Sequence, residues 1–241
     1  MFHSSISASA SISQRSTSFP EDTVASRDTT LFDVPVRRPY VLLDGIQRRW
    51  HLRRRRRKVG RAYDMALEIA RVLPANSRVL DVGCGNGFIA HHLAATVGEN
   101  VIGIDLDATT QAAIDYRQFD GKHFPVATGS VDAVLLCYVL HHAQDLGAVM
   151  NESRRVLTDG GLAVIYEDIP AAWWDRVVCW THNLKWRKRT GSCTFRSESS
   201  WCTVFNSAGF DIVSERPLSR WRNLTHPVCR KFYLLKLRSA T

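Results

Sequence analysis

The sequence predicts an α/β fold in which helices cover both faces of a mostly parallel sheet. Short apolar runs of strand type alternate along the chain with segments whose apolar residues recur at helical spacing. A glycine-rich turn lies between the first such run and the helical segment that follows it, which is where open α/β sheets bind ligands. This alternation favours parallel strands, because the connection between two parallel neighbours usually contains a helix.

The expected elements begin with a helix over residues 59–73, whose apolar residues have helical spacing and which ends at Pro74. Strand and helix patterns then alternate to residue 166, and Gly160 and Gly161 end the last helix of this series. The predicted strands are 78–82, 101–104, 131–136, 162–166, 210–214 and 231–237, and the further predicted helices are 88–97 and 146–157.

The composition is that of an ordinary globular protein, since 45% of the 241 residues are hydrophobic and 23% are charged. These values exclude wholesale disorder, a collagen-like fibre and a miniprotein held by disulfides. No apolar run reaches about eighteen residues, so no transmembrane helix is predicted. The six cysteines are scattered without a C-x-x-C pair. We therefore predict no metal site, and a reducing compartment such as the cytoplasm.

Three segments are predicted along the chain. Residues 1–30 are Ser-rich and lack the large apolar groups that offset the entropy of ordering, so we predict a disordered tail. Residues 31–58 are predicted to form a basic arm, and residues 59–241 the folded domain. The Ser-rich, acid-poor tail is also similar to an organelle transit peptide, so organelle import stays open as an alternative location.

The net charge of +9 has a local origin. Residues 48–61 hold nine of the 32 basic residues and no acidic one, which leaves 23 basic and 23 acidic residues elsewhere. This run is suited to neutralise phosphates of RNA or of an anionic membrane. It is equally typical of a solvated, charged face. Because the rest of the chain is neutral, the sequence disfavours a domain whose whole surface binds nucleic acid.

The most specific motif is the nonapeptide VLDVGCGNG at 79–87, which contains Asp81. Its glycines allow a ligand to approach the backbone closely, and the helix that follows offers free N–H groups to a carboxylate. A dinucleotide-binding turn has the spacing G-x-G-x-x-G, whereas the second and third glycines here are one residue too close. A carboxylate at the mouth of the site repels a pyrophosphate and favours a sulfonium or ammonium group. A ligand with adenosine at one end and a cationic amino acid at the other therefore fits better.

A second carboxylate, Asp105, follows the strand predicted at 101–104, eighteen residues after Gly87. It is placed to accept hydrogen bonds from both hydroxyls of a ribose. Taken singly, Asp81 is as well explained by a turn cap and Asp105 by a helix cap. Their register with the glycines favours a cofactor site over these structural roles.

Over residues 59–237 the chain resembles the class I S-adenosylmethionine-dependent methyltransferases, in particular their type 11 domain. Besides 79–87 and Asp105, the resemblance rests on FDGKHFP at 119–125, VDAVLL at 131–136, VLHH at 139–142 and LTDGGL at 157–162. It implies a Rossmann-like sheet of seven strands with an antiparallel last strand, and S-adenosyl-L-methionine as the cofactor. Only fifteen residues lead from Asp105 to Asp120, so we expect the helix after the second strand to be short or absent.

The resemblance also implies which residues contact the cofactor. The glycine turn is expected at its methionine part, Asp105 at the ribose and Asp120 beside the adenine. The full set of implied contacts is Asp81, Gly83, Cys84, Gly85, Asn86, Gly87, Asp105, Leu106, Asp120, Gly121, Cys137 and Tyr138.

The acceptor is expected beyond the carboxyl ends of the later strands, where the loops carry His141, His142 and Glu167. Methyl transfer requires alignment and exclusion of water, and a base only when the nucleophile must lose a proton. Each histidine is a candidate base, because imidazole titrates near neutrality, and Glu167 or Asp168 is a comparable candidate. The alternatives are a packed histidine, a solvated histidine and an acid that orders its loop.

Residues 170–205 are a candidate substrate lid. Four of the seven tryptophans lie within residues 173–189, and one helical face is formed by Trp173, Val177, Trp180 and Leu184. Basic residues follow at the C-terminal end, where cations suit the helix dipole. The segment fits an aromatic lid over a substrate, a helix on a membrane surface, or a helix whose tryptophans pack on the core.

The sequence thus predicts transfer of a methyl group to an oxygen, nitrogen or carbon of a small apolar or aromatic metabolite or lipid, with peripheral membrane contact as an option. The main alternative is an RNA methyltransferase that docks through residues 48–61. The Pro-Pro-aromatic and Pro-Cys motifs of nucleic-acid base methyltransferases do not occur. A third possibility is a non-catalytic partner subunit that binds the cofactor.

Overall fold

The structure, a computed structural model, describes residues 40–98, 100–223 and 226–239. The tail predicted at 1–30 and residues 31–39 of the predicted arm lie outside these ranges. Two compact units are distinguished, Met1–Gly45 and Ile46–Thr241. Of the first unit only residues 40–45 are described, and they begin a helix, whereas the second unit contains the sheet.

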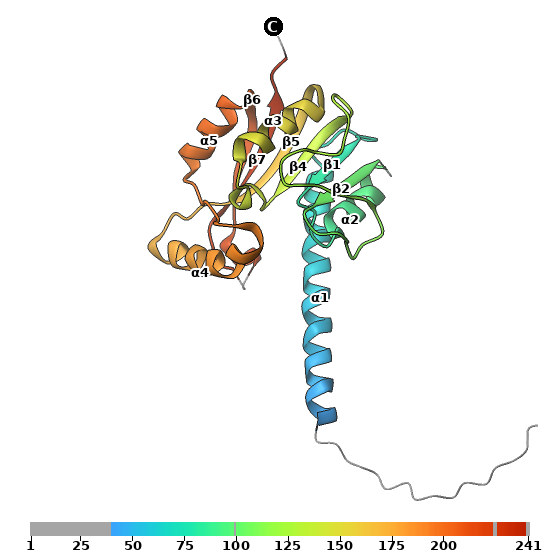
Figure 1. Cartoon of the computed structure of the whole chain (residues 1–241), viewed down its shortest axis with the longest axis vertical. Helices are drawn as coiled ribbons and strands as arrows, with labels where there is room; N and C mark the ends of the chain where they lie inside the picture. Colours follow the sequence, from blue (N-terminus) through green and yellow to red (C-terminus); the bar gives the residue numbers. More distant parts are fainter. Residues whose placement is uncertain (1–39, 99, 224–225, 240–241) are drawn as a thin grey trace, which may run out of the picture. The chain divides into compact units, whose positions relative to one another are not determined.

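Seven strands form one sheet in the order β3-β2-β1-β4-β5-β7-β6 (Figure 1). The five strands from β3 to β5 in this order are parallel, whereas β7 is antiparallel to both of its neighbours. The predicted Rossmann-like sheet with an antiparallel last strand is therefore confirmed. The strands are β1 Val79–Val82, β2 Val101–Asp105, β3 Asp115–Gln118, β4 Val131–Cys137, β5 Leu157–Asp168, β6 Phe210–Leu218 and β7 Arg230–Leu237.

Helices cover both faces of this sheet, because its central strands are apolar on both sides. On one face Leu80 and Ile165 pack with α3 and α5, and on the other Val79 and Val164 pack with α1 and α2. None of the helices among the described residues combines the length and apolar character needed to cross a bilayer. The helices are α1 Tyr40–Ala70, α2 Phe88–Val97, α3 Leu146–Val156, α4 Trp173–Thr190 and α5 Glu198–Ser207, with 3-10 turns η1 Leu140–His142 and η2 Arg220–Arg222.

Helix α1 begins much earlier than predicted, at Tyr40 instead of residue 59. The prediction rested on apolar periodicity, which is present only where the helix meets the core, for example at the buried Ala66 and Ile69. The preceding residues are mostly arginine, leucine and other good helix formers, and no proline occurs between residue 40 and Pro74. The basic run is consequently helical.

Two further elements were not predicted. Strand β3 has the sequence DYRQ, in which no apolar alternation is present, and α5 lies within the segment assigned to the lid. Strand β5 also begins before Gly160 and Gly161, at Leu157, because these glycines form an irregularity in the pairing with β4 instead of a break before the strand. As the short spacing predicted, the described chain forms no helix between β2 and β3.

Candidate functional site

A cavity of about 1320 Å³ opens at the carboxyl ends of the parallel strands. Its walls include the turn after β1, the end of β2, the segment after β4 and one face of α4. Parallel strands bring their carboxyl ends to the same edge, so residues far apart in sequence meet here. Because small-molecule sites usually occupy about 300–1,000 Å³, the cavity has room for two ligands side by side.

The glycine turn is held against the end of β2. The backbone N–H groups of Gly83 and Cys84 donate to the carbonyl of Ile104 at 2.8 and 3.0 Å. Gly83 has a φ of +68°, and a Cβ atom built on it lies 2.0 Å from Cγ2 of Val139. A side chain at this position is therefore excluded by both conformation and space. The backbone of the turn is therefore exposed to the cavity, and this concave stretch of backbone is called the cradle below.

Asp105 ends β2 and fixes the other side of this cradle. Its Oδ2 accepts a hydrogen bond of 2.7 Å from the N–H of Gly85, and its Oδ1 one of 3.3 Å from Asp107. Asp105 and Gly85 both line the cavity. A Cβ atom built on Gly85 has no neighbour within 4 Å, so the space in front of this glycine is open to a ligand.

Asp81 differs from the prediction, which placed it at the mouth of the site. Its side chain is buried behind the turn, and it does not line the cavity. Burial, and then the nearby charge of Asp105, raises the pKa of Asp81 to about 7. Its Oδ2 is buried without a hydrogen-bond partner. The carboxyl group of Asp81 is therefore only partly ionised at neutral pH, and a positive charge near it favours the ionised form.

Some of the other predicted cofactor contacts line the cavity, and others, like Asp81, do not. Cys84, Gly87 and Cys137 are not among the residues that line the cavity, and burial raises the pKa of both thiols. Gly87 has a φ of +72° and precedes α2, so its role in the turn is conformational. The predicted contacts that do line the cavity are Gly83, Gly85, Asn86, Asp105, Leu106, Asp120, Gly121 and Tyr138.

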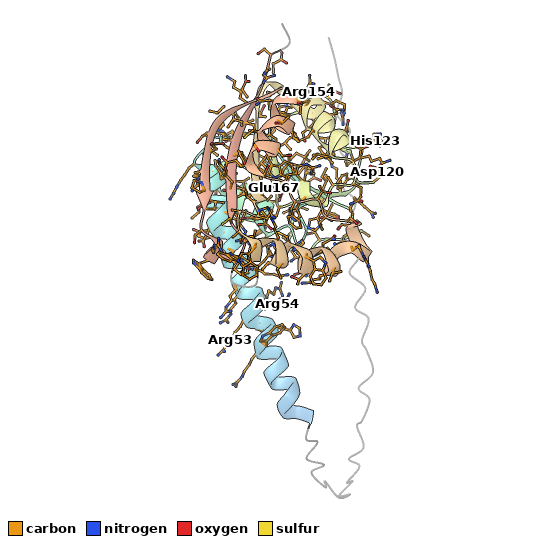
Figure 2. The ribbon with its side chains drawn as sticks, turned by 90° about the vertical axis from the view of Figure 1, so that its left-hand side faces the viewer. Arg53, Arg54, Asp120, His123, Arg154 and Glu167 are labelled. Carbon is orange, nitrogen blue, oxygen red and sulfur yellow. The ribbon has the colours of Figure 1, made fainter. Side chains whose placement is uncertain are left out.

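Asp120 and Gly121 form the outer edge of the cavity. The carboxylate of Asp120 is bonded to the ring Nδ1 of His123 at 2.9 Å, beside which it lies in Figure 2, and accepts from the backbone N–H groups of His123 and Lys122. These bonds hold the pKa of Asp120 well below its usual range. The apolar side chains of Leu106 and Phe119 line the same end, which suits a flat heterocycle.

Tyr138 follows β4 in a conformation that is unusual for a bulky residue. Its φ is +60°, and its N–H donates to the carbonyl of Tyr166 at 2.8 Å. Arg230 lies over its ring, with Cζ 5.6 Å from the ring centre. A left-handed tyrosine costs on the order of 1–2 kcal/mol, and such strain persists where the surroundings hold it, often at functional sites.

His141 and Glu167 form a buried pair beneath the cavity. Nδ1 of His141 lies 2.7 Å from Oε2 of Glu167, and the other oxygen of Glu167 accepts from the N–H of Leu140 at 2.8 Å. Burial lowers the pKa of His141, but the charge and hydrogen bond of Glu167 outweigh it, so that the pKa is raised. Glu167 is fully buried and does not line the cavity, whereas His141 does. Glu167 is therefore placed to fix the orientation of the His141 ring through this hydrogen bond.

His142 meets residues that the sequence analysis did not select. Its Nε2 lies 3.2 Å from Nε2 of His182 on α4, and its Nδ1 lies 3.0 Å from Oγ1 of Thr190. Burial, and then neighbouring imidazoles, lowers the pKa of His142 to about 3 and that of His182 to about 4. Both rings are therefore neutral at physiological pH.

Helix α4 has two contrasting faces. Val178, His182 and Trp186 line the cavity at a spacing of four residues. The face singled out in the sequence is exposed instead: Trp173 is 72% exposed, and Trp180 59%. The interpretation in which these tryptophans pack on the core is therefore wrong, and the four-residue spacing of Val178, His182 and Trp186 was the signal for the inner face.

Part of the basic run also reaches the cavity. Arg54, Lys58 and Arg61 line it from successive turns of α1. Burial lowers the pKa of Lys58, and the charges of Arg54, Arg61 and Lys185 add to this effect. Across the cavity, the buried Asp168 pairs with Arg230 at 3.0 Å and with His226 at 2.8 Å. Arg230 was also missed, because no motif marks it.

Comparisons with known proteins agree with this geometry. Residues 51–215 match the family described as methyltransferase domain. Over 108 residues the chain is 34% identical to the tRNA (carboxymethyluridine(34)-5-O)-methyltransferase ALKBH8 of Macaca fascicularis, which covers 42% of this chain and 16% of that protein. Over 91 residues it is 36% identical to the malonyl-acyl-carrier-protein O-methyltransferase of Yersinia pestis, covering 35% and 34% of the two chains.

The fold is shared with solved structures as well. A SAM-dependent methyltransferase from Thermotoga maritima superimposes with a TM-score of 0.58 at 17% identity, covering 83% of this chain and 98% of that one. The chain spans much less than two thirds of the curated relatives above, and their acceptors differ from one another.

The buried carboxyl of Asp81 leads to a prediction about stability. Its pKa in the folded state, about 7, lies above the value of about 3.9 in an unfolded chain. The native state therefore retains a proton that the unfolded state releases, and stability falls as the pH rises from about 4 to about 7. Between about pH 4 and about pH 7 the free energy of unfolding of the unaltered protein should fall by up to about 4 kcal/mol more than that of Asp81→Asn. Urea unfolding at several pH values measures this difference.

Asp115→Asn is the matched control, because the side chain of Asp115 is 52% exposed on β3. This variant should show no comparable dependence on pH. An Asp81→Asn difference that is the same at pH 4.5 and at pH 8 would contradict the assignment of a proton to Asp81.

Proposed function

The chain belongs to the class I S-adenosylmethionine-dependent methyltransferases, and from this premise we propose that it transfers a methyl group to a small, apolar or aromatic acceptor. S-Adenosyl-L-methionine, the cofactor of this family, supplies an electrophilic methyl group on a sulfonium. The observation that carries the proposal is the shared cavity: the glycine turn and Asp105 open into the same space as His141, His142 and the inner face of α4.

The residues at the turn fit this cofactor. The backbone at Gly83 and Gly85 is open to the cavity, and a Cβ atom at Gly85 would project into free space, while Asp105 offers its carboxylate to the ribose hydroxyls. The unpartnered Oδ2 of Asp81 suits a nearby positive charge, which favours its ionised form. Asp120 and Gly121, with Leu106 and Phe119, form the end that fits an adenine ring.

The opposite end of the cavity suits the acceptor. Trp186, Val178 and Val139 supply apolar walls, whereas His141 and His142 supply nitrogen atoms. We assign to His141 the orientation of the acceptor and, where the acceptor atom carries a proton, its removal. Glu167 positions His141 and favours its protonated form. Helix α4 excludes water from this end, as methyl transfer requires.

Positively charged side chains in the cavity wall further restrict the class of acceptor. Lys58 and Arg61 on α1 and Lys185 on α4 face the cavity. Cations that crowd together in a partly buried space attract a negative group. We therefore favour an acceptor with an apolar or aromatic body and an acidic substituent.

The exposed face of α4 suits contact with a membrane surface. We propose that the enzyme takes its acceptor, an apolar or aromatic molecule with an acidic substituent, from that membrane. Trp173, Val177 and Trp180 are each at least half exposed. The end of the same helix carries Arg187, Lys188 and Arg189, a combination of tryptophans and cations that is typical of helices at anionic lipid interfaces. RNA is the alternative partner, through the exposed arginines of α1 (Figure 2).

Cofactor binding depends on Asp105. Replacing it by alanine removes both the carboxylate and the bond that fixes Gly85, so the affinity for S-adenosyl-L-methionine should fall at least about tenfold, since a hydrogen bond to a charged group contributes about 1.5–3 kcal/mol. Isothermal calorimetry measures this change. The variant Asp115→Ala, which alters an exposed carboxylate on the neighbouring strand, should bind normally. An unchanged affinity in Asp105→Ala excludes the ribose assignment.

The acceptor class is tested by labelling. The purified chain is incubated with S-adenosyl-L-methionine carrying an isotopic methyl group and a cell extract, and the products are separated into an organic phase, nucleic acid and protein. We expect the label in the organic phase, and its loss with Asp105→Ala. Label in the RNA fraction instead supports the alternative of an RNA methyltransferase. Absence of label from every fraction supports a non-catalytic partner subunit.

Membrane contact is tested with vesicles. Sedimentation should show binding to vesicles that contain phosphatidylserine and weaker binding to phosphatidylcholine alone, because both tryptophans and cations contribute. Trp180→Ser should weaken binding several-fold, whereas Val213→Ser, at an equally exposed position on β6, should not. Equal sedimentation of both variants, or binding to an RNA oligonucleotide but not to vesicles, refutes the membrane surface.

A further inference from the structure

Three imidazoles converge at the acceptor end of the cavity. His141 and His142 are adjacent on η1, and His182 comes from α4, forty residues beyond His142. One ring nitrogen of each lies within 4.8 Å of those of the other two. Ring centres are 4.3 Å apart for His141 and His142 and 5.1 Å apart for His142 and His182. No other group of this kind occurs among the residues that the structure describes.

We propose that His141, His142 and His182 bind one divalent zinc ion. Imidazole nitrogen is a preferred ligand of zinc, and three protein ligands with a fourth, open position are typical of catalytic zinc sites. The absence of carboxylate or carbonyl oxygens from the set disfavours magnesium and calcium. Nothing in the cysteine pattern indicated this site, because its ligands come from two elements and none of them is a cysteine.

The distance between His142 and His182 fits a shared ion. Their Nε2 atoms are 3.2 Å apart. Two nitrogens that each lie about 2.0–2.1 Å from a tetrahedral zinc ion are separated by about 3.3 Å. The same distance is compatible with a hydrogen bond between two neutral rings, so this pair alone does not carry the site.

The third ring provides the independent observation. His141 is 1% exposed, and its Nε2 is buried without a hydrogen-bond partner. An unsatisfied buried polar atom destabilises the folded state, and a metal ion removes this penalty by accepting the lone pair. Since Nδ1 of His141 is bonded to Glu167, Nε2 is the nitrogen that remains for an ion.

The surroundings of the rings match those of metal ligands. Glu167 holds Nδ1 of His141 at 2.7 Å, and Thr190 lies 3.0 Å from Nδ1 of His142. Metal-binding histidines almost always use their second nitrogen in this way, and a carboxylate partner raises the basicity of the ligand. Glu167 is itself fixed by the N–H of Leu140. The Nε2 atoms of both histidines are thus directed by their second nitrogens.

The position of the ion gives it a chemical role that rests on the proposed function. His141, His142 and His182 all line the cavity, so the open fourth position faces the acceptor. Zinc there binds an oxygen or sulfur atom of the acceptor and lowers its pKa, which makes the atom a better nucleophile at neutral pH. With the ion bound, zinc replaces His141 as the group that activates the acceptor, because both ring nitrogens of His141 are then engaged. The proton leaves to solvent, and no oxidant or reductant is needed.

The site is tested on the untagged full chain after treatment with a chelator. Calorimetric titration with Zn²⁺ alone should give one ion per chain, and Co²⁺ should give the strong visible absorption of a four-coordinate complex. His182→Ala should weaken zinc binding at least tenfold, and Glu167→Gln should weaken it about ten- to a hundred-fold, as loss of an outer partner does. His123→Ala, which alters a histidine with a side chain 80% exposed outside the cluster, should bind as the unaltered chain does.

The outcomes separate the zinc site from methyl transfer. Thermal unfolding checks that His182→Ala is folded, which is expected because His182 is only half-buried. If the folded unaltered chain binds no zinc, or if His182→Ala binds it equally well, the site is refuted. Zinc binding by a chain that methylates nothing in the labelling experiment refutes the proposed function and leaves the site standing.

Discussion

The site depends on the bonding of one turn to the end of one strand. The N–H groups of Gly83 and Cys84 meet the carbonyl of Ile104, and that of Gly85 meets the carboxylate of Asp105. These bonds fix the turn after β1 to β2 and leave its inner side open. Val139, which follows β4, lies so close to Gly83 that no side chain fits between them. Three neighbouring strands therefore determine a single backbone path, and the cavity on its far side follows from it.

The buried charges at the end of β5 have a different effect. Glu167 and Asp168 are adjacent and buried, and a strand normally sends such neighbours to opposite faces. Glu167 binds His141, whereas Asp168 binds His226 and Arg230. Buried ion pairs contribute little net stability, because desolvation offsets their attraction. Their consequence is positional: each carboxylate fixes the orientation of groups around the cavity.

The fold was predictable from the sequence where burial leaves a pattern. The central strands β1, β4 and β5 are apolar on both sides, and the glycine motif marks the turn that they support. Asp105 was placed correctly at the end of β2 because strand and motif agree. The pattern gave no sign of β3, whose four residues are mostly polar and partly exposed, nor of the first half of α1, which has helix-forming residues without an apolar face.

The candidate site was predictable only as far as it is local in sequence. The contacts at Gly83, Gly85 and Asp120 lie within motifs, whereas His182, His226 and Arg230 reach the cavity through tertiary structure. Asp81 was misplaced because spacing does not reveal whether a residue on a central strand faces the ligand or the interior. The tryptophans of α4 were misleading for a related reason. They are the most conspicuous residues of that helix, but the cavity is lined by the less conspicuous face, on which Val178, His182 and Trp186 recur.

The antiparallel strand explains how one edge of the sheet carries both halves of the site. In a parallel sheet only carboxyl ends meet at this edge, and these supply Asp105, Tyr138 and Asp168. Because β7 runs the other way, its first residue, Arg230, pairs with Asp168, the last residue of β5. The guanidinium of Arg230 is thereby placed beside the carboxylate of Asp168, and it also lies over the ring of Tyr138, whose backbone is in the left-handed region. The reversal of β7 thus brings its first residue to the edge at which the other strands end. The acceptor side thereby gains the guanidinium of Arg230, a basic group that the parallel strands alone do not supply.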